Sequence, residues 1–261
     1  MLKLFNISKT FNPGTITEKK ALKGIDLELD DGDFVTVIGG NGAGKSTLLN
    51  LIAGVHSTDT GSIFLDGLDL TDMPEFKRAK YLGRVFQDPM MGTAANMEIE
   101  ENLAMAMRRG KKRGLSWHIQ PSEEALYTEK LKLLDLGLEN RHTAKVGLLS
   151  GGQRQALTLL MATLQKPKLL LLDEHTAALD PKTARKVLEL TEQLVSQEHL
   201  TTFMVTHNMK DAIRYGNRLI MMMEGRIVYD VRGEEKKNLK VEDLLAKFSL
   251  AGEMNDKLLL G

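Results

Sequence analysis

Residues 39–47, "GGNGAGKST", combine glycines, a lysine and two hydroxyls in a spacing that can bind phosphate. The pattern G-x-x-x-x-G-K-[ST] requires a strand before it and a helix after it, and the strand-like 34–38 and helix-like 46–54 supply both. All four required positions are filled, by Gly39, Gly44, Lys45 and Ser46. Glycines let backbone N–H groups surround an anion, the lysine reaches the β- and γ-phosphates, and the hydroxyl can bind Mg²⁺. We therefore predict a nucleoside triphosphate site, and a chance glycine loop is the less favoured interpretation.

Two adjacent carboxylates follow the most apolar strand pattern in the chain. In "LLLLDEHTAALD", residues 169–180, Asp173 and Glu174 come directly after a run of leucines. The carboxyl ends of parallel strands meet at one edge of a sheet, so both side chains are expected beside the phosphate loop. Asp173 would hold the Mg²⁺ shell, and Glu174 could accept a proton from an attacking water. A solvated acidic turn is the alternative.

Two further polar side chains close strand patterns. Gln87 ends "GRVFQ" and His207 ends "TFMVTH". Each signal is weak alone, because a lone histidine is more often a core or surface residue than a functional one. A polar side chain now ends three strands of the same expected sheet, which favours a role in the site for both residues.

A second glycine-rich turn occurs far along the chain, in "GLLSGGQRQAL" at residues 147–157. Its glycine pair opens directly into a helical pattern, and a helix N-terminus favours negative charge. One nucleotide has a single triphosphate tail, so one chain has no evident use for two such turns. The spacing raises this question without answering it.

Composition narrows the function classes. The 261 residues include 35 Lys+Arg and 35 Asp+Glu, and zero net charge is not typical of a nucleic-acid-binding protein. Cysteine is absent, which excludes disulfides and thiolate metal sites and suits a reducing cytosol. The first residues lack the apolar segment of a signal peptide, and no apolar run reaches the ~18 to 20 residues of a membrane span. We expect a cytosolic protein with no nucleic-acid partner.

The remaining pattern indicates an α/β fold. Alternating apolar and polar residues at 2–8 and 22–30 predict an antiparallel edge. Continuous apolar strands alternating with helices predict a mainly parallel sheet covered on both faces. Helices are also expected at 153–165, 182–197, 208–215 and 241–248, and the spacing from 88 to 148 is helical only. We predict one domain over 1–261, with a nucleotide-binding core at 1–87 and 149–250 and a helical subdomain at 88–148.

Together these residues resemble the ATP-binding subunit of ABC transporters over nearly the whole chain. "GGNGAGKST" is similar to the Walker A motif, "LLLLDE" to Walker B, and "LSGGQ" at 149–153 to the family signature. Gln87 resembles the Q-loop glutamine, "AALD" at 177–180 the D-loop, and His207 the switch histidine. One glycine motif is common by chance, but the full ordered set is specific. The resemblance implies a P-loop NTPase core with a mainly parallel sheet, an N-terminal antiparallel β subdomain and an inserted α-helical subdomain.

The resemblance also implies a role for each matching residue. The ATP-binding residues are Phe11, which stacks on adenine, and Gly39, Gly40, Asn41, Gly42, Ala43, Gly44, Lys45, Ser46 and Thr47. The catalytic residues are Glu174, His207 and Gln87, the Mg²⁺ ligands are Ser46, Gln87 and Asp173, and the D-loop contributes Asp180. The signature residues that act in trans are Ser150, Gly151, Gly152 and Gln153. In this family two subunits pair head to tail and each signature covers the other's ATP, which gives the second anion-binding turn its use.

Transport follows from the same resemblance. The family implies an ATP-hydrolysing subunit that pairs with a second copy or a related ATPase subunit, on the cytoplasmic side of the cell membrane. It would drive a separate integral membrane permease and serve an extracytoplasmic substrate-binding protein indirectly. The variant "DEHTAALDPKTA" resembles a bacterial uptake subgroup, which implies import of a small solute such as an amino acid.

Two competing functions are less favoured. A soluble non-transport ABC-type ATPase would carry two ATPase domains in one chain or a long coiled coil between its motifs, and this sequence has neither. A P-loop kinase would not explain "LSGGQ".

Three local features leave alternatives open. Many family members have proline after the catalytic glutamate, where this chain has His175, although Glu174 and the D-loop spacing are intact. The stretch "RRGKKRG" at 108–114 is either a solvated basic loop or a contact with anionic lipid or the permease. Met90 and Met91 follow Gln87 and are either core residues or part of an adaptable docking groove.

Overall fold

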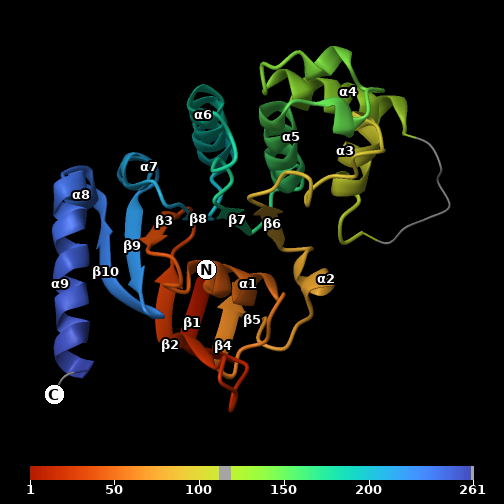
Figure 1. Ribbon diagram of the computed structural model, residues 1–261. Helices are drawn as coiled ribbons and strands as arrows, with labels where there is room; N and C mark the ends of the chain where they lie inside the picture. The colour runs from red at the N-terminus through yellow and green to blue at the C-terminus, as the bar shows by residue number, and fades with distance from the viewer. Residues whose placement is uncertain (112–118, 260–261) are drawn as a thin grey trace. The chain divides into compact units, whose positions relative to one another are not determined.

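The computed structural model describes residues 1–111 and 119–259 (Figure 1). The chain forms two compact units. The first joins Met1–Glu75 to Thr201–Gly261, and the second is Phe76–Leu200.

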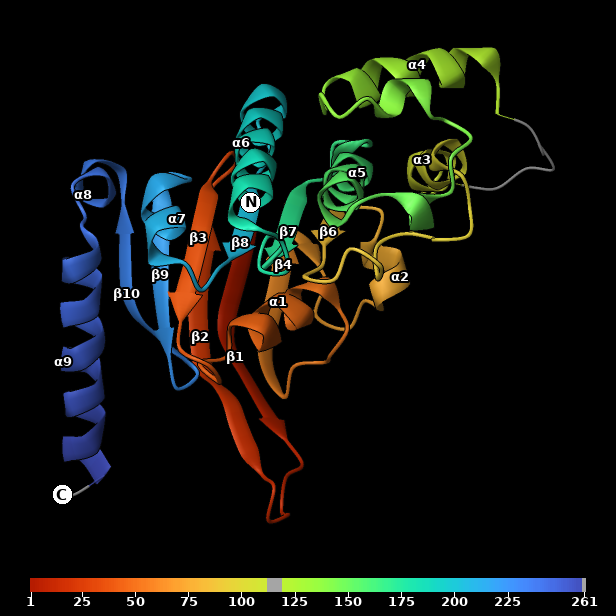
Figure 2. The ribbon, with the colours of Figure 1, turned by 45° about the horizontal axis from the view of Figure 1, so that its top comes forward.

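An antiparallel sheet begins the first unit (Figure 2). Its strands are β1 (Leu2–Phe11), β2 (Lys19–Leu29), β4 (Thr60–Leu65) and β5 (Leu68–Asp69), in the order β2-β1-β4-β5. Leu2 of β1 lies opposite Leu29 of β2 on one side and opposite Leu65 of β4 on the other. Residues that lie opposite each other on neighbouring strands face the same side of the sheet, and these three leucines are all buried.

A second set of strands in the first unit carries the first glycine-rich turn. It consists of β3 (Phe34–Gly39), β8 (Thr202–Val205), β9 (Arg218–Met223) and β10 (Arg226–Arg232), in the order β10-β9-β3-β8. Strand β3 pairs in parallel with both neighbours, whereas β10 returns antiparallel to β9. Parallel strands are covered on both faces, which explains why β3 and β8 are continuous apolar runs.

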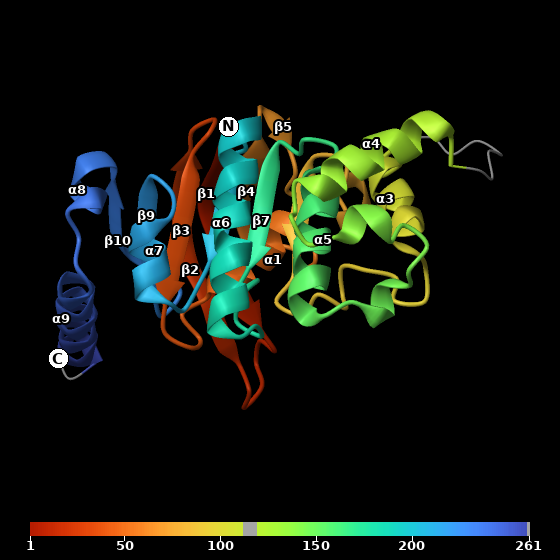
Figure 3. The ribbon, with the colours of Figure 1, turned by 90° about the horizontal axis from the view of Figure 1, so that it is seen from above.

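The described residues of this unit also form the helices α1 (Lys45–Ala53), α7 (Met209–Arg214), α8 (Gly233–Lys237) and α9 (Val241–Leu259). Ile38 of β3, Ala212 of α7 and Leu244 of α9 share one buried cluster with residues of β9 and β10. Figures 1 and 3 show α7 and α9 along these strands. None of the helices that the structure describes has both the length and the apolar character that a membrane span requires.

The second unit is mostly helical. Strands β6 (Leu82–Val85) and β7 (Leu169–Asp173) pair in parallel, with Leu82 opposite Leu169. The helices are α3 (Ile99–Met107), α4 (Pro121–Lys132), α5 (Gly151–Thr163) and α6 (Pro181–Glu198), with the single turns η1 (Leu138–Asn140) and η2 (Val146–Leu148). The four-residue α2 (Glu75–Arg78) lies at the boundary between the units.

The α/β class and the mixture of antiparallel and parallel strands are confirmed. Within 88–148 the described residues form only helices and turns, apart from a single bridge between Glu98 and Lys145. The prediction of separate core segments at 1–87 and 149–250 stays a prediction, because contacts divide the chain elsewhere, after Glu75 and after Leu200. The sequence also ended two strands too late: β6 stops before Gln87 and β8 before His207.

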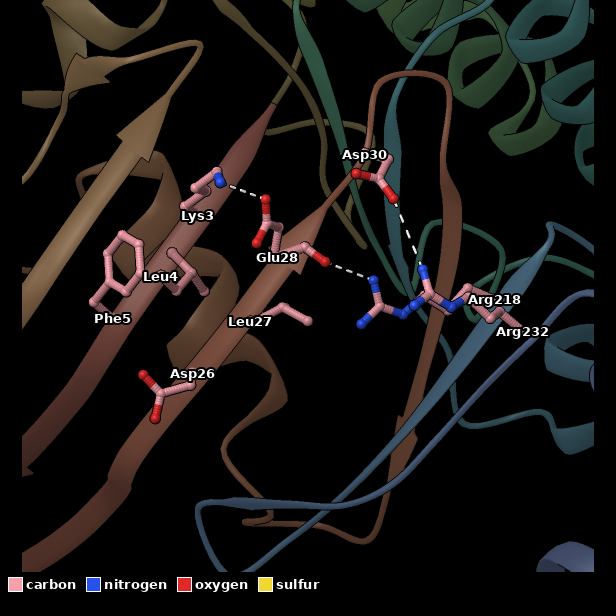
Figure 4. Close-up of a pocket in the computed structure, with 9 residues that line it drawn as sticks. All are labelled: Lys3, Leu4, Phe5, Asp26, Leu27, Glu28, Asp30, Arg218 and Arg232. Carbon is pink, nitrogen blue, oxygen red and sulfur yellow. Dashed lines mark hydrogen bonds and ion pairs between the residues drawn. The ribbon is translucent and has the colours of Figure 1, made fainter.

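One pocket of the first unit lies between β1, β2 and the β9–β10 hairpin (Figure 4). Its volume is about 580 Å³. Two pairs of its charges contact each other: Lys3 Nζ lies 2.5 Å from the Glu28 carboxylate, and Arg232 Nη1 lies 3.8 Å from Asp30 Oδ2. The nine residues that line this pocket include none of the predicted site residues, and the chemistry must be sought elsewhere.

Candidate nucleotide-binding site

The predicted phosphate loop connects β3 to α1 in the first unit. Lys45 opens α1, and the residue is 7% exposed. Its Nζ donates to the Gly39 carbonyl at 2.8 Å and to the Gly40 carbonyl at 3.2 Å. A charged group this buried needs such partners, and the loop carbonyls hold the ammonium directly over the turn. The loop therefore places a cation and a helix N-terminus together, which is a site for an anion.

Two glycines of this loop leave no room for a side chain. A β-carbon at Gly39 would overlap the Met222 carbonyl of β9. Gly44 has φ +102°, and a β-carbon there would lie 2.7 Å from the Ala21 carbonyl. The backbone between them is exposed at Gly40, Asn41 and Gly42, so its N–H groups are accessible to a ligand.

The start of α1 suits phosphate and magnesium together. The first turn of α1 contains no acidic side chain that would repel phosphate. Ser46 is exposed on that turn and Thr47 is half-buried, whereas Ala43 packs into the core. The hydroxyl of Ser46 is therefore available to a hard cation.

Phe11 and His207 belong to the same unit. Phe11 ends β1 half-exposed, with its ring edge-on to His56 at 5.3 Å between centroids. His207 is exposed and lies in the turn between β8 and α7. Asn208 caps α7 by accepting from the Lys210 and Asp211 N–H groups, which fixes the backbone beside the histidine.

Two carboxylates end β7 in the second unit. Asp173 Oδ2 lies 3.7 Å from Arg84 Nη2 of the neighbouring strand, and both side chains are mostly buried. Glu174 has φ +44°, the left-handed region that a residue with a β-carbon rarely occupies. Strained backbone of this kind gathers at functional sites, where surrounding contacts impose it.

Gln87 lies two residues beyond β6 and is exposed. The following turn is closed by Asp88, whose carboxylate accepts from the Met90 N–H at 2.9 Å. Met90 is 45% exposed and Met91 is 69% exposed, so neither is a core residue. Arg154 Nη1 lies 2.7 Å from the Met90 sulfur, which fixes one side of this surface.

The second glycine-rich turn is the N-terminus of α5. Ser150 Oγ accepts from the Gln153 N–H at 3.3 Å, and Gln153 Oε1 accepts from the Ser150 N–H at 3.1 Å. This reciprocal capping box leaves N–H groups of the first turn, including that of exposed Gly151, for an anion. Gly152 faces inward instead, and a β-carbon there would overlap the Thr183 methyl of α6.

Asp180 of the predicted D-loop caps α6. Its carboxylate accepts from the Lys182 and Thr183 N–H groups at 3.2 and 3.1 Å. Hydrogen bonds from Thr183, its side chain first, lower the pKa of Asp180. The carboxylate therefore stays ionised and defines where the helix begins.

The sequence pattern of the family described as "ABC transporter" matches residues 22–177, well over half of the chain. The chain belongs to this family. It is 46% identical over 256 residues to a "Tyrosine transport ATP-binding protein" of Clostridioides difficile, covering 96% of this chain and all of that protein. A phosphonates import ATP-binding protein of a Synechococcus strain is 36% identical, covering 88% and 84% of the two chains.

Solved structures agree on the fold. A dimeric ATP-binding cassette bound to ADP and Pi is 31% identical, with a TM-score of 0.74 and coverage of 89% of this chain and 98% of that one. The ADP conformation of another ATP-binding cassette of an ABC transporter has a TM-score of 0.77 at 28% identity, covering 95% and 98% of the two chains. The predicted ABC ATPase fold is confirmed. The expectation that the chain is an ATP-hydrolysing subunit of the import type is confirmed as well.

This ABC ATPase divides its predicted residues between its units. Phe11, the phosphate loop at 39–47 and His207 lie in the first unit. The second unit holds Gln87, Ser150, Gly151, Gly152, Gln153, Asp173, Glu174 and Asp180.

Sequence reasoning missed one residue of the second unit. His175, taken only as a departure from the family pattern, is 2% exposed and bonded to α6. Nothing in the sequence distinguished it from an exposed histidine.

The basic stretch at 108–114 begins with two arginines that have partners in the second unit. Arg108 forms an ion pair with Glu123 at 2.9 Å. Arg109 Nη2 donates to the Ala162 carbonyl at 3.3 Å, and burial lowers the pKa of Arg109. Both arginines therefore have a partner within the second unit, and the role of the basic stretch stays a prediction. Lys111 is exposed, and the remaining basic residues, Lys112 and Arg113, lie outside the described residues.

Proposed function

We propose that this chain is the ATPase subunit of a bacterial importer for a small solute such as an amino acid. Two subunits, identical or related, close on ATP and drive a separate membrane permease. The observation that carries this proposal is the exposed, capped N-terminus of α5, an anion site additional to the phosphate loop of the same chain. The similarity to a dimeric ATP-binding cassette supports pairing through this second site.

The phosphate loop would bind the triphosphate of the subunit's own ATP. Its backbone N–H groups surround the phosphates, and Lys45 leaves the Gly39 and Gly40 carbonyls for the β- and γ-oxygens. Phe11 stacks on adenine. Phosphate oxygens would then replace the loop carbonyl oxygens as partners of the Lys45 ammonium. The ammonium has oxygen acceptors both before and after ATP binds, so it keeps its charge.

Magnesium would accompany ATP. The residues proposed to hold it would be Ser46 through its hydroxyl, Gln87 through its amide oxygen, and Asp173, all of them oxygen donors as this hard cation prefers. In the described part of the chain no three acidic or histidine side chains converge on a metal site. Magnesium held mainly by phosphates and water needs no such cluster, so the residues present fit a metal that arrives with its nucleotide. When bound, magnesium would supply positive charge that offsets the charge of the phosphates.

Hydrolysis of ATP would use the remaining predicted side chains, each in a different role. Glu174 accepts the proton of the attacking water, and His207 contacts the γ-phosphate. The turn at Ser150–Gln153 of the partner covers the same phosphate with its helix N-terminus. Asp180 keeps its structural cap on α6 and holds the D-loop in place.

The membrane partner would dock beside Gln87, on the segment 87–96 and the helical region that follows. Met90 and Met91 supply exposed apolar surface that can adapt to a partner. The subunit lies at the cytoplasmic side of the membrane, and a substrate-binding protein reaches it only through the permease. The tyrosine and phosphonate transport functions named for the relatives support import, and an amino acid is favoured because the tyrosine relative matches along its whole length. These names give no support to a soluble non-transport ATPase.

The test of hydrolysis uses Glu174→Gln, which keeps the shape of the side chain but cannot take a proton. We expect parental ATP affinity, loss of turnover, and a dimer in size-exclusion chromatography only with ATP and Mg²⁺. The exposed Glu192→Gln on α6 is the matched control and should behave as the parent. Parental turnover of Glu174→Gln would remove Glu174 from the mechanism.

The test of transport is capture of a permease from detergent-solubilised membranes by the tagged full chain. Met91→Glu places a charge on the proposed docking surface and should weaken capture at least about tenfold. Leu250→Glu changes an equally exposed apolar residue of the first unit and should leave it intact. Recovery of no integral membrane protein by the parent chain would contradict the transport role.

A further inference from the structure

The turn between β7 and α6 carries the proposed general base and holds it in an unfavourable conformation. Glu174 has φ +44°, and its carbonyl accepts from the Ala177 N–H at 2.9 Å. This tight turn returns the chain to Asp180, which caps α6. A residue with a β-carbon stays in the left-handed region only where neighbouring contacts hold it, so the turn needs an anchor.

His175 supplies such an anchor. The side chain is 2% exposed, and its Nε2 lies 3.1 Å from the hydroxyl of Thr191 on α6, which is 1% exposed. That hydroxyl donates its only proton to the Val187 carbonyl at 2.8 Å. Nε2 must therefore be the protonated nitrogen that donates to Thr191, because the hydroxyl has no second proton to give. A buried relay from the imidazole through Thr191 to Val187 thus connects the turn to the helix.

We propose that His175 is a positioning residue for ATP hydrolysis, which holds the Glu174 turn against α6 through the bond to Thr191. The inference rests on the proposed role of Glu174 as the general base. The relative position of Glu174 and Asp180 is then fixed, because the turn that carries Glu174 is bonded to α6, and Asp180 caps that helix. At a position where many members of the family have proline, this chain constrains the turn by a side-chain anchor.

Two substitutions remove the anchor with little change in volume. His175→Leu fills the site with an apolar side chain and leaves the bond from Thr191 to Val187 in place. Thr191→Val keeps the shape of the β-branched side chain and removes the acceptor of the imidazole. We expect each to lower kcat for ATP between about 10- and 100-fold, as a misplaced catalytic group does. KM for ATP should stay within about twofold, because Phe11 and the phosphate loop, which are proposed to bind adenine and the triphosphate, lie in the other unit.

A conservative variant and a control separate positioning from general loss of structure. His175→Gln can present an amide N–H to Thr191 and should recover most of kcat. Thr163→Val removes a buried hydroxyl that bonds to the preceding turn of α5 in the same way, with no histidine partner, and should keep parental kcat. The double variant His175→Leu/Thr191→Val should be no slower than either single variant, because both break one interaction.

The outcomes are distinguishable from failure of the proposed function. If Glu174→Gln is inactive while both His175→Leu and Thr191→Val turn over at the parental rate, Glu174 remains the base and the positioning role is wrong. A fall in kcat that Gln does not rescue, or that appears equally in Thr163→Val, also overturns it. If His175→Leu does not fold, Thr191→Val decides the question alone by the same kcat and KM criteria.

Discussion

At the scale of single residues, charge and hydrogen bonding fix what each proposed group can do. Lys45 is held by two loop carbonyls that compete with phosphate for the same ammonium. Asp180 is committed to a helix cap, and the His175 imidazole to a buried hydroxyl. Glu174, in the turn between β7 and α6, is the side chain proposed to move a proton.

Lys45→Ala should weaken binding of ATP because it removes a buried positive charge from the phosphates. Hydrogen bonds to charged groups contribute about 1.5–3 kcal/mol, so we expect a loss of affinity between about 10- and 100-fold. Titration with a fluorescent ATP analogue measures it, with the exposed Lys132→Ala of α4 as the control. Unchanged affinity together with unchanged turnover would contradict the site.

The buried imidazole of His175 should make stability depend on pH. Burial lowers the pKa of His175 from 6.5 to about 4, so its neutral form is favoured in the folded state. The resulting stability is complete above pH 6.5 and is lost as the pH falls toward 4. Between pH 7.5 and pH 5 the parent should lose about 2 kcal/mol more free energy of unfolding than His175→Leu. Urea denaturation of both proteins at the two pH values measures this difference, and parallel losses would contradict it.

At the scale of elements, the two signature glycines have different surroundings. Gly151 is exposed, and a β-carbon there would meet only Leu179 at an ordinary 3.5 Å. Gly152 is buried under Thr183, where no β-carbon fits. The sequence "SGGQ" alone does not separate them, because the difference depends on how α6 packs on α5.

Gly151→Asp should therefore abolish hydrolysis without unfolding the chain. A carboxylate at a helix N-terminus is favourable for the helix and repels phosphate, so we expect an unchanged or higher Tm and parental ATP binding. Gly152→Asp should lower stability by about 1–3 kcal/mol through overpacking against α6. Thermal denaturation and ATPase assays of both variants separate the two effects. Parental turnover of Gly151→Asp would show that the α5 N-terminus binds no phosphate.

Most elements follow from the sequence, and the failures have physical causes. Long apolar runs such as β3 and β7 are unambiguous because burial on both faces demands them. The short β5, α2 and α8 were missed because two to five residues show no periodicity. The helical spacing over 88–148 is interrupted after α4, whose C-cap is Leu133, because Asp135 and Gly137 adopt positive φ. The sequence predicts the phosphate loop because all of the residues that its chemistry needs lie in one short stretch at a fixed spacing. The hydrogen bond of His175 could not be predicted in this way, because its partner Thr191 lies in another element.

At the scale of the whole molecule, one chain carries two turns that are proposed to bind anions, for one triphosphate. Lys45 belongs to the first and Gly151 to the second. Head-to-tail pairing in the proposed dimer gives each a use, since two composite sites form across a two-fold axis. Each site then needs a phosphate loop from one subunit and a signature turn from the other. Two inactive variants with lesions in different turns should therefore complement each other.

The mixture of Lys45→Ala and Gly151→Asp tests this pairing directly. In a mixed dimer, the intact phosphate loop of the Gly151→Asp chain faces the intact signature of the Lys45→Ala chain, and the opposite site carries both lesions. Random assembly makes about half of the dimers mixed, each with one intact site, so roughly a quarter of parental ATPase activity should return. The matched control is the double variant Lys45→Ala/Gly151→Asp mixed with an equal amount of parent chain. Its mixed dimers contain a lesion in both sites, so only the parent–parent dimers, about a quarter of the total, should hydrolyse ATP, whereas about half of parental activity would indicate that each chain uses its own signature. If each chain used its own signature, mixing the two single variants could restore nothing, since every chain would keep one broken turn.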